Sequence, residues 1–185
     1  MNPVLAAIAD RRSNRAYRQT PLSEETLNVL LKAAVESPSA VNRQPWHFTV
    51  VRDQNMLKEL NAAIWEGMMA RDPEKRSPRF QDPNFDVFYK APCVIFISGD
   101  QKNSWAAIDC GIAVENIALA AQGLDLGSVI LGMPKEAFMG PKGDYFRQAL
   151  SFPEGHDFEI AIAVGEAADT KAAHPVGENK ISFVG

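Results

Sequence analysis

The sequence concentrates positive charge in one short segment, RRSNRAYR, which runs from Arg11 to Arg18. Arg11, Arg12 and Arg15 carry guanidinium groups whose paired N–H donors match the oxygens of a phosphate, and Ser13 adds a hydroxyl. These residue types at this spacing indicate an anion-binding site. A solvated basic turn, with its arginines paired to acidic side chains at the surface, would have the same spacing. The residues alone leave both interpretations open.

A second segment, SPSAVNRQPWHF, covers residues 37–48 and contains two prolines that impose an irregular backbone. Asn42 and Gln44 offer amide groups for hydrogen bonds to the edge of a ring, and Trp46 could stack on a flat ligand. Composition alone favours a different interpretation, a rigid connection in which Trp46 fills part of the core.

A third segment, GLDLGSVILG, covers residues 123–132 and has Gly127 and Gly132 at the G-x-x-x-x-G spacing of a phosphate loop. Met133 and Pro134 stand where a Walker A loop needs Lys and then Ser or Thr, so that motif is excluded. The GxGxxG dinucleotide fingerprint is also absent from the sequence. The segment therefore predicts a strand bounded by glycines, whose end lets the backbone approach something flat.

Other kinds of catalytic site find no support. The three histidines have no metal-ligand spacing, so we expect no metal site. No G-x-S-x-G elbow is present, and no protein nucleophile or other catalytic side chain can be named. If the protein is an enzyme, a bound cofactor is expected to carry the chemistry.

Length and composition predict a single domain over residues 1–185 in a soluble, cytoplasmic protein. The chain has 185 residues, 46% of them apolar, and a formal charge of −4, which disfavours a nucleic-acid binder. No uncharged apolar stretch approaches the roughly 18 residues that cross a membrane, and no basic segment precedes the apolar N-terminus. Cys93 and Cys110 lie in apolar stretches, so two reduced thiols are favoured over a disulfide.

The elements that must position these segments follow from periodicity and capping signals. Ser23 is the expected N-cap of one helix and Asp53 that of another. Residues 71–86 contain three prolines and many charges, which indicates a surface excursion that could act as a mobile cover. We expect helices at 3–10, 24–37, 54–68, 104–122 and 144–150, and strands at 47–52, 93–98, 128–131 and 158–164.

Two features of this α+β pattern lack an obvious place in a single chain. The helix expected at 104–122 is apolar on nearly every side, so it should be buried against two surfaces, both from this chain or one from a second copy. The run Ile181–Val184 resembles a strand and must pair with something, here or in a partner.

In this order, the segments resemble those of the nitroreductase family of FMN-dependent flavoproteins. The resemblance rests on RRSNRAY, SPSAVNRQPWHF, DCGIAVENIALAAQGLDLGSVILG and FEIAIAVGEA. It spans most of the chain and is weakest at 71–86 and in the C-terminal extension, 171–185. It implies a nitroreductase-like fold, a central, mostly antiparallel sheet flanked by helices, in an intertwined homodimer with two FMN sites at the interface.

The resemblance also implies which residues bind FMN. The positions that hold the phosphate and the ribityl chain are Arg11, Arg12, Ser13 and Arg15, with Arg15 near the flavin pyrimidine. The positions that reach the flavin from the other subunit are Pro38, Ser39, Ala40 and Asn42. The loop that passes the ring close to N5 contains Ile130, Leu131 and Gly132. A basic residue after the last strand completes the phosphate site, and here it is Lys180, with Lys171 as the alternative.

The implied activity is an FMN-dependent oxidoreductase in which NAD(P)H reduces the flavin and a small electron-poor acceptor, such as a nitroaromatic or a quinone, is then reduced by a ping-pong mechanism. Two alternatives stay open. One is a flavin-binding protein without turnover. The other is an enzyme of the same fold with divergent chemistry, such as dehalogenation or flavin breakdown.

Overall fold

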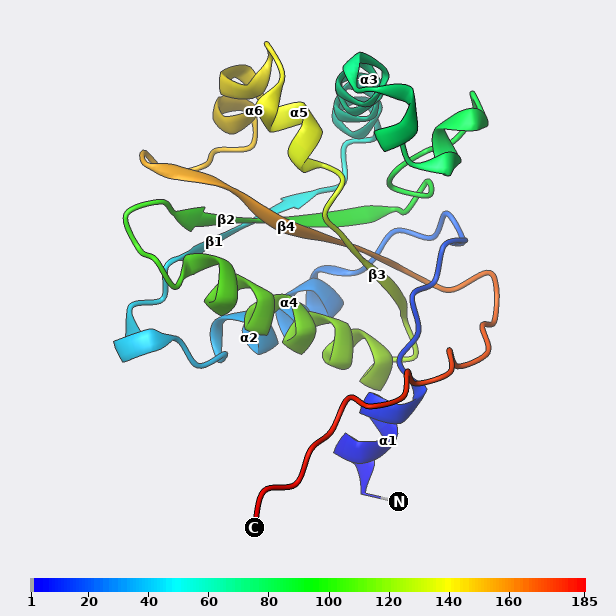
Figure 1. Ribbon diagram of the computed structural model, residues 1–185, viewed down its shortest axis with the longest axis vertical. Coiled ribbons are helices and arrows are strands. Elements are labelled where there is room, and N and C mark those ends of the chain that lie inside the picture. Colours follow the sequence, from blue (N-terminus) through cyan, green and yellow to red (C-terminus); the bar gives the residue numbers. More distant parts are fainter. Residues whose placement is uncertain (1) are drawn as a thin grey trace.

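The computed structural model describes residues 2–185 and is built on one four-stranded sheet (Figure 1). The strands are β1 (Trp46–Val51), β2 (Cys93–Asp100), β3 (Gly127–Leu131) and β4 (His156–Gly165). Their order is β1-β2-β4-β3, and each neighbouring pair is antiparallel. The expected α+β class with a central antiparallel sheet is confirmed.

Helices cover both faces of the sheet, and the sheet divides the hydrophobic core into two clusters (Figure 1). On one face lie α2 (Glu24–Val35) and α4 (Ala106–Gly123); on the other lie α3 (Gln54–Ala70), α5 (Lys135–Met139) and α6 (Gly143–Ala149). Ile95 and Ile97 of β2 pack toward α2 and α4, whereas Val94 and Phe96 pack in the cluster on the other side. Because β2 is buried on both faces, its sequence is a continuous apolar run.

Helices α2 and α3 begin where their capping residues predict. The Ser23 hydroxyl accepts a hydrogen bond from the Thr26 amide at 3.1 Å, and the Asp53 carboxylate accepts one from the Asn55 amide at 2.8 Å. The short helix α1 (Pro3–Asp10) has the expected bounds, with Asn2 as its N-cap. Capping signals work here because they are local and need no tertiary contact.

The structure differs from the sequence-based expectations at several points. Strand β1 begins one residue earlier than expected, and β2 runs two residues further, to Asp100. Helix α5 was not expected, since five residues are too few to show a helical period. Residues 181–184 form no strand in this chain, and Phe183 is 96% exposed.

The excursion at 71–86 lies mostly at the surface, as expected, but it is anchored. It contains the short 3₁₀ helices η2 (Pro73–Lys75) and η3 (Pro78–Gln81). Phe80 is buried, and its ring meets that of Trp65 edge-on at 4.7 Å between centroids.

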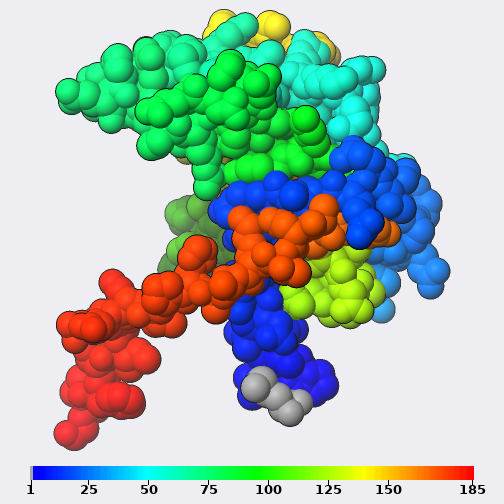
Figure 2. Space-filling model, turned by 90° about the vertical axis from the view of Figure 1, so that its right-hand side faces the viewer, coloured from blue at the N-terminus to red at the C-terminus, as the bar shows by residue number. Residues whose placement is uncertain are grey.

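Both termini project from the body of the molecule. Figure 2 shows α1, in blue, and the C-terminal extension, in red, standing away from the packed layers. Their apolar side chains, among them Val4, Leu5 and Ile181, are exposed. Among residues 2–185, no helix combines the length and the apolar character needed to span a membrane.

Candidate functional site

The arginine-rich segment lies along the free edge of β3. Ser13 forms a parallel bridge with Ser128, and the Asn14 amide donates to the Ser128 carbonyl at 2.9 Å. Gly127 permits this approach, because a Cβ there would lie 3.0 Å from the Cβ of Asn14 and 2.9 Å from that of Ala167. The sheet edge therefore fixes the backbone that carries the arginines.

Tyr17 secures the end of the same segment. It pairs with Ala167 as an antiparallel bridge, and its buried hydroxyl donates to the Asn14 carbonyl at 2.9 Å. Burial raises the pKa of this hydroxyl well above its usual value, so the group stays protonated and keeps its donor role.

The guanidinium groups of this segment are only partly satisfied. Arg11 lies 3.6 Å from Glu115, but among residues 2–185 neither Arg12 nor Arg15 has an acidic partner within ion-pair distance. The Nε atoms of Arg12 and Arg15 are buried and make no hydrogen bond within the described chain. Since an unpaired buried N–H is costly, these two groups fit an anionic ligand better than a solvated turn.

The segment with residues 38–44 is held by α4. Asp109, buried in the first turn of α4, accepts the Ala40 amide with both oxygens, at 3.2 and 3.3 Å. About two turns further on, Asn116 donates to the Ser37 hydroxyl at 2.8 Å. The Ser39 hydroxyl accepts the Gln44 amide at 3.0 Å.

This segment also has an unusual backbone. The φ angles are +52° at Val41, +55° at Asn42 and +47° at Gln44, all in the left-handed region. A β-branched residue rarely adopts this conformation, yet Val41 does so and is 87% exposed. Such strain persists only where surrounding contacts enforce it, and it collects at functional sites.

The end of β3 is open above its backbone. Ile130 is half-buried and Leu131 buried, while Gly132 is exposed, and apart from its two chain neighbours no residue comes within 4 Å of where its Cβ would be. A planar group could approach the backbone there closely, as the glycine spacing predicts.

The structure does not bring all the predicted residues together in one chain. Ala40 is bonded to Asp109 near the start of α4, whereas Arg12 shares a hollow with Gln122 near its end. Asp109 and Gln122 are separated by a rise of about 20 Å along the helix. In Figure 1 the two segments lie at opposite ends of α4.

The two candidate lysines also lie apart. Lys171 lines a hollow of about 270 Å³ together with Arg12, Asn14 and Asp169. Lys180 lies in the exposed extension. The structure thus places the alternative residue, Lys171, beside the arginine segment.

Some contacts of the site were not foreseen from the sequence. Tyr89 lies under Arg15, with 5.9 Å between the guanidinium carbon and the ring centroid, and Asp109 holds Ala40. An acidic residue in the first turn of an otherwise apolar stretch was the available signal for Asp109. Trp46 is half-buried and packs against the core, with 6.1 Å between its ring centroid and that of Phe48. This agrees with the interpretation that composition favoured, in which Trp46 fills part of the core.

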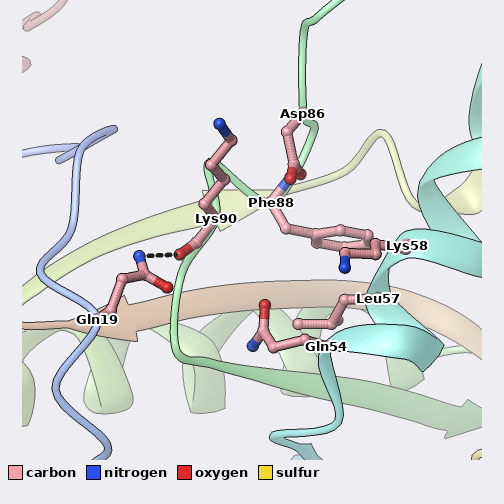
Figure 3. A pocket seen from close by; sticks show the side chains of 7 residues that line it. All are labelled: Gln19, Gln54, Leu57, Lys58, Asp86, Phe88 and Lys90. Atoms are coloured by element: carbon pink, nitrogen blue, oxygen red, sulfur yellow. Dashed lines mark hydrogen bonds between the residues drawn. The ribbon is translucent and has the colours of Figure 1, made fainter.

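Other groups of interest lie outside this arrangement. A hollow of about 290 Å³ between Gln19, α3 and the 86–90 turn is lined by none of the predicted residues; Figure 3 shows the Gln19 amide donating to the Lys90 carbonyl across it, at 2.9 Å. Cys93 and Cys110 are free, fully buried thiols, as expected, and burial raises the pKa of each to about 12.

Residues 8–166 match the model of the Nitroreductase family. The chain belongs to this family. A relative from Archaeoglobus fulgidus, provisionally named an NADH dehydrogenase/NAD(P)H nitroreductase, is 39% identical over 140 residues, which cover 75% of this chain and 73% of the relative.

Solved nitroreductase structures have the same fold over the whole chain. A nitroreductase with bound FMN from Desulfitobacterium hafniense matches with a TM-score of 0.93 and 33% identity, and one from Bacteroides fragilis, also with bound FMN, with 0.91 and 29%. Each match covers 100% of both chains. The resemblance inferred from the sequence motifs is confirmed, and the nitroreductase-like fold with it.

Proposed function

We propose that this member of the Nitroreductase family is an FMN-dependent NAD(P)H oxidoreductase that acts as a homodimer and reduces small electron-poor acceptors. The observation that carries the proposal is the pair of buried, unpartnered Nε atoms of Arg12 and Arg15, on a segment fixed against the sheet. FMN is named in the two nitroreductase structures above, and a Bacillus subtilis relative, 27% identical over 149 residues, is named FMN reductase [NAD(P)H].

The charges of the segment suit this cofactor. The phosphate of FMN carries close to two negative charges, and Arg11, Arg12 and Ser13 offer donors for it beside Lys171. Lys180 remains the other candidate, provided that the extension folds back onto a dimer. Arg15 would lie at the flavin pyrimidine, where a positive charge favours the reduced, anionic ring.

The remaining residues would orient and enclose the flavin ring. The irregular backbone of Pro38, Ser39, Ala40 and Asn42, in which Asn42 has a positive φ, would offer fixed N–H and C=O groups to the flavin from a second copy of the chain. Ile130, Leu131 and Gly132 would pass the ring at the end of β3. When bound, FMN would take a hydride from NAD(P)H and give electrons to a second substrate, which predicts ping-pong kinetics. No side chain is assigned as a proton donor, and solvent could supply the proton.

The separation of the two halves supports a homodimer. Within one chain the arginine segment and residues 38–42 lie about 20 Å apart along α4, and a second copy of the chain would bring the missing half to each site. Exposed apolar side chains are available for such contact: on α1 they include Val4 and Ile8, and on α4 Ile108 and Ile112.

Purified protein provides the first test. It should be yellow, with about one FMN per chain, and NADH or NADPH should bleach the flavin anaerobically before a nitroaromatic or quinone restores the colour. A colourless protein that cannot be reconstituted with FMN would overturn the proposal. Arg15→Ala should weaken FMN binding, whereas Arg18→Ala, in an exposed side chain of the same segment, should change it little.

A second candidate activity is reductive dehalogenation. A relative from Thermotoga neapolitana named iodotyrosine deiodinase is 24% identical over 126 residues. An iodinated phenol in the acceptor panel distinguishes the two activities, because iodide release at a rate above that of nitro reduction would favour dehalogenation. FMN bound without any NAD(P)H oxidation would instead identify a flavin-binding protein without turnover.

A further inference from the structure

Two contacts within the chain place the guanidinium group of Arg15. One is a hydrogen bond from Nη1 to the Ser13 carbonyl, which at 3.3 Å is long. The other is the face of Tyr89, with 5.9 Å between the guanidinium carbon and the ring centroid. Since the Nε atom has no partner, the Tyr89 ring is the main constraint on where this cation lies.

Tyr89 is itself held in place. Arg79 donates a hydrogen bond to the Tyr89 hydroxyl, and its guanidinium carbon lies 6.0 Å from the ring centroids of both Tyr89 and Phe85. The Phe85 and Tyr89 rings meet edge-on at 5.8 Å. Tyr89 has a φ of +55°, in the left-handed region, so its backbone conformation is enforced by these surroundings.

The contacts continue into the surface excursion at 71–86. The ring of Phe85 meets that of Phe80 at 5.3 Å, and Phe80 meets Trp65 of α3 at 4.7 Å. The Trp65 indole also donates to the Phe85 carbonyl at 2.9 Å. An unbroken series of aromatic contacts therefore runs from α3 through the excursion to Arg15.

We propose that Tyr89 is a positioning residue for Arg15 and that Arg79 couples the 71–86 excursion to the cofactor site through Tyr89. This inference rests on the proposed function, in which Arg15 contacts the flavin. A cation over an aromatic face is attracted by the negative face of the ring, and more strongly where water is excluded. Loss of the ring should therefore free the Arg15 guanidinium and weaken its hold on FMN.

The test is a double-mutant cycle on the FMN dissociation constant. Tyr89→Leu should weaken FMN binding about tenfold, which corresponds to about 1.4 kcal/mol. In an Arg15→Ala background the same substitution should change the constant by less than about twofold, because its effect passes through Arg15. Tyr89→Phe keeps the ring and should restore most of the affinity. Tyr145→Leu, which removes a half-exposed tyrosine on α6, is the matched control and should have no effect.

The flavin midpoint potential gives a second measurement that a merely structural role would not change. If the reduced flavin loses tenfold more affinity than the oxidised flavin, Tyr89→Leu lowers the two-electron potential by about 30 mV. Arg79→Leu alters an exposed side chain and should change the FMN dissociation constant and the midpoint potential in the same directions as Tyr89→Leu, but by less. This variant keeps the test valid if Tyr89→Leu does not fold.

The outcomes separate this inference from the proposed function. Fully additive effects of Tyr89→Leu and Arg15→Ala, or an unchanged constant and potential in Tyr89→Leu, would overturn the positioning role while the wild type still binds and turns over FMN. A wild type that binds no FMN would overturn the proposed function instead.

Discussion

Replacement of Asp109 by Ala should loosen the 38–44 segment more than any other single change in α4. The carboxylate is buried and accepts the Ala40 amide with both oxygens, at 3.2 and 3.3 Å. A hydrogen bond to a charged group contributes about 1.5–3 kcal/mol, and its loss would also leave the Ala40 amide unpaired. With three residues at positive φ, this segment has strain that the lost contact no longer opposes.

A loss of about 2 kcal/mol corresponds to a roughly 30-fold larger population of the open segment. Arg43 is exposed within it, so the initial rate of tryptic cleavage after Arg43 measures that population when closing is faster than cleavage. Cleavage after Lys180, in the exposed extension, is the internal reference.

Two further variants make the test specific. Asp109→Asn keeps an oxygen that can accept the Ala40 amide, so its cleavage rate should lie between those of the wild type and Asp109→Ala. Glu25→Ala removes an exposed carboxylate from the first turn of α2 and should leave the rate unchanged. If Asp109→Ala is cleaved after Arg43 no faster than Glu25→Ala, the segment is not held by Asp109 and this reasoning fails.

Three other predictions concern distinct parts of the molecule. Because burial raises the pKa of Cys93 and Cys110 to about 12, a thiol reagent at pH 8 should label neither in the native protein and both in denaturant; rapid native labelling would contradict their burial. Burial, with a smaller contribution from His156, lowers the pKa of His47, so the folded state binds a proton at His47 less readily than the unfolded chain does. The contribution of neutral His47 to the free energy of unfolding is therefore complete above a pH of about 6.5 and is lost as the pH falls below that value. Urea unfolding at pH 7 and pH 5.5 should accordingly show a smaller difference for His47→Gln than for the wild type. A chain ending at residue 170 should dimerise more weakly in sedimentation velocity than the full chain, and an unchanged dimer would show that the extension adds nothing.

Local signals in the sequence were sufficient for most helices and strands. Ser23 and Asp53 cap their helices through hydrogen bonds to residues only three and two positions further along the chain, so the sequence alone indicates them. The sequence signals failed at two places, helix α5 and residues 181–184, for opposite reasons. The first is too short for a period, and the second has strand-forming residues with no neighbouring strand to pair with in this chain.

The site was only partly visible in the sequence because its contacts join distant segments. Arg12 and Arg15 were recognisable from residue type and spacing, but their unpartnered Nε atoms depend on how the segment packs. The ring of Tyr89 is 74 residues from Arg15 along the chain and approaches it only through the tertiary fold. No periodicity or capping rule reports such a contact.

Helix α4 relates the two halves of the proposed site, and its geometry makes a final prediction. Its inner face packs on the sheet, whereas Ile108 is 55% and Ile112 37% exposed. In a twofold dimer, each contact between two residues occurs twice, once in each direction. If two α4 helices cross antiparallel near Ile112, the end of α4 that holds Ala40 in one copy therefore points toward the end of α4 near Arg12 in the other copy. Ile112→Glu places two like charges at that crossing and should shift the protein to monomers and release FMN together. A variant that is monomeric yet retains FMN with wild-type affinity would show that one chain suffices for the site, and a variant that stays dimeric would show that the helices meet elsewhere.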